Sequence, residues 1–331
     1  SACSRDQCAI MAFGQGNRID FGYDGDVVYH EFTHGIVDVT ANLDMFIIDR
    51  ALGISYEPGA LNEGYADYFS STISGDPRLA DYVSGGGGGG EASLRDLSSG
   101  LVCPSDLFGQ IHADGTIWGG ALWTVRERIG AEKADAVAFA ALLTLSPTAT
   151  LDEAATLVVS TAEMLDALDD SDRAAVPAAM EERGLLRSRP IAPIEDGRAH
   201  GGYSGVEFAT GSLGAGVVPL HYSVEIPVDA TSLTIRIRNL TPAGVYDLYL
   251  RTGAPVTYIG PRTPGLIGDT SFEAARVVAL REGTDYPLPR CQTLYMALRA
   301  TDLNTAGQSI YTCPFYPPDA SANLTPTLRL A

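Results

Sequence analysis

The nine residues from Val27 to Gly35 constrain this chain more than any other stretch, because they place two histidines and a glutamate at helical spacing. Positions i and i+4 of an α-helix lie on one face, so His30 and His34 can offer two imidazoles to one metal ion. Glu31 lies about 100° further round the helix, where its carboxylate can reach a water near the ion without binding the ion. The stretch predicts a helix that carries part of a metal site. Two core histidines bonded to backbone carbonyls are the alternative.

The same helix has an apolar stripe, which we expect to be its buried back. Its members are Val28, Phe32, Ile36 and Val39. The histidines lie roughly opposite, so the pattern predicts an apolar back and a metal-facing front. Asp26 is expected to start the helix, since an acidic residue suits the positive end of the helix dipole.

A second stretch, Leu61–Phe69, supplies the third protein ligand that a catalytic zinc site needs. Glu63 and Asp67 are four residues apart and share one face of a predicted helix. We expect Glu63 to bind the metal and Asp67 to accept the N–H of a ligating histidine, which fixes its tautomer. The alternative is an amphipathic helix with exposed acids, but the other residues of the stretch are too apolar for a solvated face.

Taken together, His-Glu-Phe-Thr-His and Asn-Glu-Gly-Tyr-Ala-Asp resemble the gluzincin metallopeptidases, nearest to the thermolysin and fungalysin families. The resemblance covers about the first 190 residues. It implies a secreted zinc endopeptidase that acts on peptide or protein substrates. The implied zinc ligands are His30, His34 and Glu63, with Glu31 as the general base. Asp67 is implied to accept a hydrogen bond from one of the ligating histidines.

The same resemblance implies roles for residues outside the two zinc motifs. Tyr56 and His112 match the tyrosine and histidine that stabilise the oxyanion, and Arg95 matches the arginine that binds the substrate carbonyl. Ala12 and Phe13 resemble part of the edge strand that pairs with an extended peptide. Asp26 stands where thermolysin-like enzymes use an aspartate for calcium, so Ca²⁺ is a further candidate besides Zn²⁺.

Charge and hydropathy exclude some classes of partner. The chain has 331 residues, with 41 acidic against 22 basic side chains and a formal charge of −19. A nucleic-acid backbone would be repelled, so no nucleic-acid partner is expected. No apolar run reaches the roughly 20 residues of a membrane helix. The start of the sequence lacks the features of a signal peptide, so secretion implies that the targeting segment has been removed.

Five cysteines suggest disulfide bonds in an exported protein. Cys291 and Cys313 bracket two predicted strands and form the best pair. Cys3, Cys8 and Cys103 leave room for one further bridge and one unpaired thiol.

The expected fold class is α+β, a mostly helical zincin domain over residues 1–190 followed by an all-β antiparallel sandwich over 203–331. Helical spacing after His112, a capping box at Thr150 and a stop at Gly184 predict the helical lobe. Arg189–Gly202 has the prolines and glycines of a linker. Beyond it, apolar and polar residues alternate around Leu233, Leu248 and Leu294, as in short antiparallel strands.

The region from Tyr222–Pro227 to Tyr246–Arg251 is similar to the bacterial pre-peptidase C-terminal domain. Val245 stands where the first aspartate of that family's motif would be. The resemblance implies an accessory role in export, processing or substrate docking.

One departure from the resembled families leaves alternatives open. Only 29 residues precede His30, whereas those families carry a β-rich lobe there. That lobe has been cut away, belongs to another chain or is dispensed with, so a separate N-terminal lobe or pro-segment is a candidate partner. The remaining alternatives are a zinc aminopeptidase and a non-catalytic adhesion or carbohydrate-binding protein that works through its C-terminal sandwich.

Overall fold

The structure is a computed structural model, and it divides into two compact units. It describes residues 11–15, 19–49, 52–85, 92–196, 198, 200, 202, 220–237, 244–256, 266–268, 272–273, 276–281, 288–303 and 327–330. The first unit comprises Ser1–Met45, Glu57–Cys103 and Ile111–Ser188, and the second comprises Phe46–Tyr56, Pro104–Gln110 and Arg189–Ala331. The functional domains assigned to 1–190 and 203–331 stay predictions.

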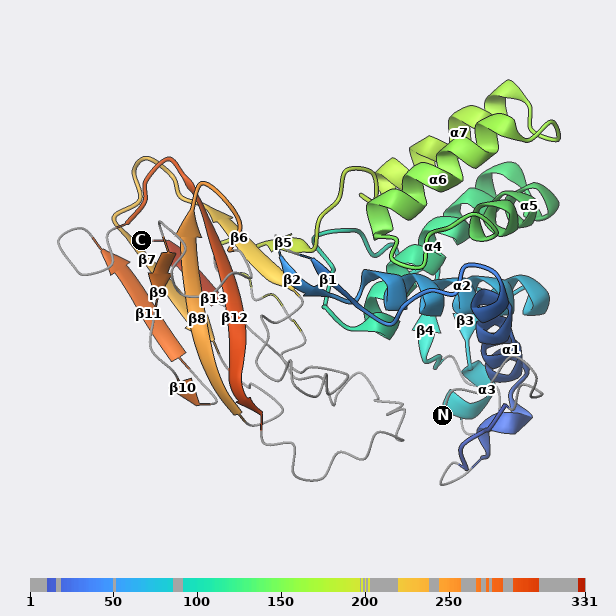
Figure 1. The fold of residues 1–331 in the computed structure, drawn as a ribbon, viewed down its shortest axis with the longest axis horizontal. Coiled ribbons are helices and arrows are strands. Elements are labelled where there is room, and N and C mark those ends of the chain that lie inside the picture. Colours follow the sequence, from blue (N-terminus) through green and yellow to red (C-terminus); the bar gives the residue numbers. More distant parts are fainter. Residues whose placement is uncertain are drawn as a thin grey trace. The chain divides into compact units, whose positions relative to one another are not determined.

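The first unit is mainly helical (Figure 1). Its elements are η1 (Phe21–Tyr23), α1 (Gly25–Val39), α2 (Glu57–Ser74), β3 (Arg78–Leu79), α3 (Asp81–Ser84), β4 (Arg95–Asp96), α4 (Ile111–Ile129), α5 (Ala131–Leu142), α6 (Leu151–Met164) and α7 (Asp170–Glu182). Helix α2 packs on α1 on one side and on α4 on the other, and α4 also contacts α5 and α7. Strands β3 and β4 pair antiparallel.

Local sequence accounts for the ends of these helices. Thr150 caps α6 in a capping box with Glu153, as predicted. Gly130 and Gly184 follow α4 and α7 with φ of +85° and +66°, a region that glycine enters without strain. The helical spacing expected after His112 is confirmed in α4, since the apolar residues that follow it, Trp118, Leu122, Val125 and Ile129, are all buried on one stripe.

The predicted orientation of α1 is wrong. Phe32 and Val39 on the expected back are 55% and 83% exposed, whereas Val27, His30 and Val37 are buried. The physical reason is that α1 packs on α2 with the side that carries the histidines, because polar side chains of α2 meet the imidazoles there. The apolar stripe therefore lies mainly at the surface of the described part of this unit.

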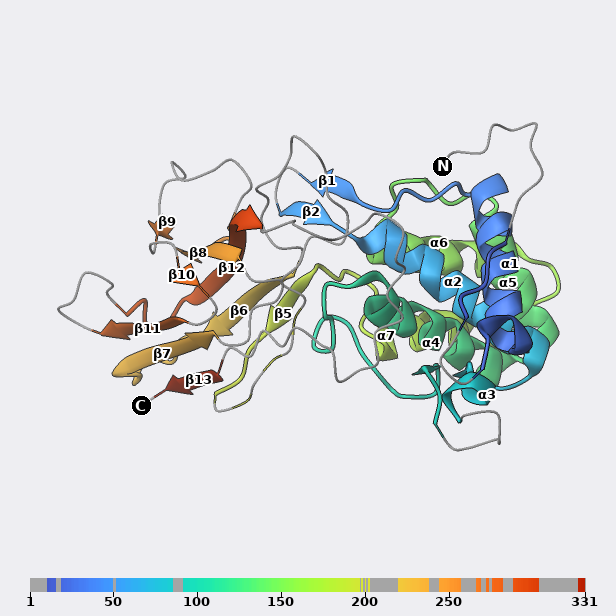
Figure 2. The same ribbon diagram turned by 90° about the horizontal axis from the view of Figure 1, so that it is seen from below.

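The second unit is built from short strands. They are β1 (Ile47–Asp49), β2 (Gly53–Ser55), β5 (Ile191–Pro193), β6 (His221–Glu225), β7 (Ser232–Ile237), β8 (Gly244–Thr252), β9 (Leu266–Gly268), β10 (Phe272–Glu273), β11 (Arg276–Arg281), β12 (Thr293–Leu303) and β13 (Thr327–Leu330). One sheet has the order β10-β8-β12-β6-β5 with β9 beside β8, and another has the order β11-β7-β13, as Figure 2 shows for β7 between its neighbours. β1 and β2 pair separately.

The alternating patterns predicted strands correctly. On β7, Leu233 and Ile235 are buried while Ser232 and Thr234 are partly exposed, as period-two spacing requires. On β8, Leu248, Tyr249 and Leu250 are all buried, so both faces of this strand are covered there. The described part of the chain therefore combines helices and strands, as the α+β class requires. A sandwich arrangement of the two larger sheets stays a prediction.

One expectation about the second unit needs correction. Residues 191–193 lie in β5 instead of a linker, and β5 pairs with β6 in parallel, whereas the described strands within 203–331 pair antiparallel with one another. Prolines at 190 and 193 suggested a linker, but β5 is the edge strand, where a proline removes no ladder hydrogen bond.

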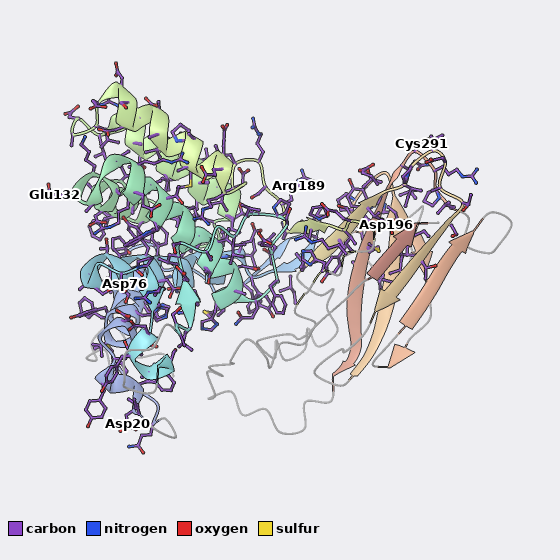
Figure 3. All side chains as sticks on the ribbon, turned by 180° about the vertical axis from the view of Figure 1, so that it is seen from behind. Asp20, Asp76, Glu132, Arg189, Asp196 and Cys291 are labelled. Atoms are coloured by element: carbon purple, nitrogen blue, oxygen red, sulfur yellow. The ribbon has the colours of Figure 1, made fainter. Side chains whose placement is uncertain are left out.

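The cysteines leave the disulfide prediction open. Cys291 is exposed at the turn before β12 (Figure 3) and Cys103 is buried, and neither is bonded to another described residue. Cys3, Cys8 and Cys313 lie outside the described residues, so a Cys291–Cys313 bond stays a prediction. The glycine run from Gly86 lies outside them too. None of the described helices has both the length and the apolar character needed to cross a bilayer.

Candidate metal centre

The two histidines of the sequence motif meet on α1. Asp24 caps this helix, and its carboxylate accepts a hydrogen bond from the backbone N–H of Asp26 at 3.0 Å. One turn further along, the imidazoles of His30 and His34 lie edge to face, with their Nε2 atoms 3.0 Å apart. Helical spacing has therefore brought both rings to one point.

Glu63 of α2 completes the group. Its Oε2 lies 3.2 Å from His30 Nε2, and its Oε1 lies 3.8 Å from His34 Nε2. The ligand atoms of the three residues all lie within 4.8 Å of one another. Two ligands at the usual zinc distance in a tetrahedral site are about 3.3 Å apart, so the spacing fits one ion of that size.

Asp67 and Asn62 orient the two imidazoles. Asp67 Oδ1 lies 2.8 Å from His30 Nδ1, and since a carboxylate only accepts, Nδ1 of His30 carries the hydrogen. Asn62 Oδ1 lies 2.8 Å from His34 Nδ1, which assigns the hydrogen of His34 in the same way. Both Nε2 atoms of the neutral rings then point lone pairs toward Glu63, and three electron-pair donors converge where only a cation or a proton can satisfy them.

Charge around His30 shows how the site behaves without an ion. Burial alone would lower the pKa of His30, but its hydrogen bonds with Asp67 and Glu63 outweigh burial and raise that pKa to about 9. A metal ligand must be deprotonated, so an incoming cation displaces this proton.

Arg95 of β4 holds the other side of Asp67. Its guanidinium donates two hydrogen bonds to that carboxylate, from Nε to Oδ2 at 2.7 Å and from a terminal nitrogen to Oδ1 at 2.6 Å. Asp67 is fully buried, which alone would raise its pKa, but Arg95 and His30 lower the pKa to about 2. The carboxylate thus stays charged. The substrate-binding role of Arg95 stays a prediction.

His112 lies in the first turn of α4, close to the same Glu63 oxygen that His30 approaches. Its Nε2 is 3.5 Å from Glu63 Oε2, too far for a good hydrogen bond. Burial lowers the pKa of His112, with Arg95 acting in the same direction against the opposing charge of Glu63. The ring is therefore neutral at pH 7. Its oxyanion role stays a prediction.

The other predicted site residues are placed as follows. Glu31 is partly exposed beside His30 and close enough for its charge to act on Arg95. Tyr56 is buried, with its ring packed edge-on against Phe46. Ala12 is exposed and Phe13 is half-buried. The roles proposed for all four stay predictions.

The strand expected to contain Ala12 and Phe13 is absent over residues 11–15. Ala9 and Ile10 lie outside the described residues. The backbone carbonyl of Gly14 instead accepts a hydrogen bond from Phe21 N–H at 3.1 Å, so this segment bends back on the start of the first unit.

The calcium prediction gains no support at Asp26. Its Oδ2 accepts the backbone N–H of Ala80 at 3.1 Å. Within the described ranges, the only group of three or more potential metal ligands is the one formed by His30, His34 and Glu63.

Asn62 is the site residue that sequence reasoning did not assign. The sequence did contain a signal, since Asn62 is a polar residue directly before Glu63 in a largely apolar stretch. In the structure its side chain is buried, with 7% of the residue exposed. Only the packing of α2 on α1 shows that this amide reaches His34.

These residues define a class of site. Two histidines one turn apart and a glutamate from a second helix leave a fourth position open, and each histidine is oriented through its other nitrogen, as in catalytic zinc sites.

Sequence comparison gives relatives named bacillolysin and neutral protease. The chain is 28% identical over 173 residues to bacillolysin of Bacillus amyloliquefaciens, which covers 48% of this chain and 31% of the relative. It is 29% identical over 179 residues to neutral protease NprE of Bacillus pumilus, which covers 48% and 54%. The chain thus spans between a third and about half of these relatives. The resemblance to thermolysin-like metallopeptidases is confirmed, and that of the C-terminal part is not shown.

Other comparisons add less. A solved structure, the precursor of protealysin from Serratia proteamaculans, has a TM-score of 0.44 and 21% identity, covering 53% of this chain and 62% of that one. A TM-score at this level does not establish a shared fold. No protein-family model matches the sequence.

Proposed function

We propose that this protein is a zinc-dependent endopeptidase whose metal is held by His30, His34 and Glu63. The observation that carries the proposal is the convergence of three electron-pair donors, with the two imidazole Nε2 atoms 3.0 Å apart and each Nδ1 atom 2.8 Å from a side-chain oxygen. Relatives named bacillolysin and neutral protease support the reaction class. A zinc ion bound here supplies Lewis acidity, which polarises the scissile carbonyl and makes water more acidic.

The chain's own residues then carry the protons. Glu31 takes a proton from the attacking water and returns it to the leaving amine, since it adjoins His30 without belonging to the ligand group. His112, neutral and beside Glu63, donates a hydrogen bond to the oxygen on which negative charge develops, and Tyr56 does the same. Asp67 and Asn62 keep the ligand rings in place throughout.

The test is hydrolysis of casein and of a peptide blocked at its N-terminus. We expect activity that a chelator removes and added zinc restores, together with one bound zinc per chain that is lost in Glu63→Gln. Activity that persists after complete removal of metal would exclude the mechanism. Cleavage of free but not of blocked peptides would favour the aminopeptidase alternative.

The finer predictions are part of the same proposal. We infer that the protein is secreted, and that its C-terminal strands form a β-sandwich with an accessory role in export, processing or docking. The alternating burial on β7 and the burial of three consecutive residues on β8, Leu248 to Leu250, support the sandwich. Fractionation of the producing cells, and binding assays with the full chain and with a zinc-free Glu63→Gln form, test these two points.

A further inference from the structure

Glycines face each other where α2 and α4 pack together. A Cβ added at Gly64 would lie 2.5 Å from the carbonyl oxygen of Gly115, and one added at Gly115 would lie 2.9 Å from the carbonyl oxygen of Ala60. Real Cβ atoms essentially never come within 3.0 Å of such atoms. The two backbones can approach this closely only because both positions lack a side chain.

This contact lies directly against the proposed metal ligand. The same added Cβ at Gly115 would lie 2.9 Å from Cβ of Glu63, the residue that precedes Gly64 on α2. His112 belongs to the same turn of α4 as Gly115, with its Nε2 3.5 Å from Glu63 Oε2. The glycine contact therefore sets how far the Glu63 carboxylate stands from both α4 and the imidazoles of α1.

We propose that Gly64 and Gly115 are positioning residues, which hold Glu63 at ligand distance by letting α4 rest on the turn of α2 that carries it. This inference rests on the proposed function, because it takes Glu63 as a metal ligand.

Distances show why the effect reaches the metal. Ordinary contact begins at 3.4 Å, so an atom placed at 2.9 Å must be relieved by a movement of 0.5 Å, the difference between the two values. Both obstructing atoms are fixed to the backbone of α2, so a flexible side chain cannot absorb the movement. Metal–ligand distances tolerate only about 0.2 Å. A methyl group at 115 thus moves Glu63 by more than coordination allows.

The experiment compares Gly115→Ala and Gly64→Ala with Gly120→Ala in the full chain. Gly120 lies further along α4, and its added Cβ would lie 2.9 Å from the carbonyl oxygen of Leu97 and 3.3 Å from a terminal nitrogen of Arg183. The crowding is similar, but its nearest contacts include no atom of α2. The readouts are zinc affinity by competition with a chromophoric chelator, the visible spectrum of the cobalt form, and Tm of the metal-free protein.

We expect all three substitutions to lower the metal-free Tm. Gly115→Ala and Gly64→Ala should also weaken zinc binding at least tenfold, the usual effect of disturbing a ligand's support, and alter the cobalt spectrum. Gly120→Ala should stay within about threefold of the unmodified protein. Since Gly64→Ala opens the same contact from the α2 side, it carries the test if Gly115→Ala does not fold.

Two outcomes would overturn the inference: unchanged affinity in both contact variants, or an equal loss in Gly120→Ala. Glu63→Gln separates this failure from failure of the proposed function. If Glu63→Gln loses zinc while the glycine variants keep it, only the positioning role fails. If Glu63→Gln binds zinc as the unmodified protein does, the ligand assignment and the proposed function fail together.

Discussion

The side-chain oxygen of Asn62 lies 2.8 Å from Nδ1 of His34 and fixes the direction in which that ring presents its lone pair. Replacing Asn62 with alanine should free the imidazole to rotate and should weaken zinc binding by about 10- to 100-fold, as loss of an orienting partner does elsewhere. Asn62→Asp, which keeps an acceptor at the same place, serves as the control and should retain most of the affinity. Zinc binding that is equally tight in Asn62→Ala would show that His34 is held by packing alone.

Glu31 should be required for turnover but not for metal binding, because it lies next to His30 and is not part of the ligand group. Glu31→Gln removes the base with little change in shape, and we expect peptide hydrolysis to fall by about 10²- to 10⁴-fold. Zinc content and Tm should stay at the values of the unmodified protein. If the variant loses zinc as well, the carboxylate belongs to the ligand set and the division of roles is wrong.

The helical part of the fold and the grouping of His30, His34 and Glu63 were predictable because both follow from local spacing. Residues four apart share a helix face, which is enough to pair His30 with His34 and Glu63 with Asp67. The buried side of α1 was not predictable from the sequence of that helix alone. Its apolar stripe suggested one side, but the polar groups of α2 bind the histidines and so bury the opposite side.

The features that the sequence did not predict depend on contacts between segments that are far apart in the chain. Arg95 follows Asp67 by 28 residues, and nothing in either local pattern shows that the guanidinium binds that carboxylate with two hydrogen bonds. The parallel pairing of β5 with β6 was hidden for the same reason, since prolines suggest a loop and only the sheet order shows an edge strand.

Asp26 should make stability depend on pH. Burial and the carboxylates of Asp24 and Asp81 raise the pKa of Asp26 above its usual 3.8, although hydrogen bonds from Ser74 and Ala80 oppose this. A raised pKa means that the folded protein holds the proton more tightly than the unfolded chain does. The contribution of Asp26 to the free energy of unfolding is therefore fully present below pH 3.8 and is lost as pH rises through the folded-state pKa.

Asp26→Asn tests this sign, since an amide oxygen can still accept the N–H of Ala80 while the charge is gone. In metal-free protein at pH 7 we expect the variant to be more stable by about 0.5 kcal/mol, a small value because solvent screens a half-buried group. The advantage should disappear below pH 3.8, where the aspartate is protonated in both states. Urea unfolding at both pH values, with and without Ca²⁺, measures it. Calcium-dependent stabilisation that is lost in the variant would instead support the calcium prediction.

Gly184 should be the most sensitive glycine at the end of a helix in the first unit. It ends α7 with φ of +66°, its N–H bonds to the carbonyl of Glu181, and the next N–H, of Leu185, bonds to the carbonyl of Met180, which together form a Schellman motif. A Cβ at this position would lie 1.9 Å from the carbonyl oxygen of Cys103. Alanine therefore meets both a left-handed backbone and a fixed backbone atom.

Gly75→Ala separates these two costs. Gly75 has φ of +76°, but nothing lies within 4 Å of its added Cβ, so only the backbone strain of about 1 kcal/mol applies. For Gly184→Ala we expect a loss of about 3 kcal/mol, because relieving the clash moves the segment at Cys103 away from α7. Urea unfolding of the metal-free protein gives both values, and the difference between them isolates the clash. Equal losses in the two variants would mean that Cys103 moves aside freely, and that its bond from N–H to the carbonyl of Arg183 does not hold this segment in place.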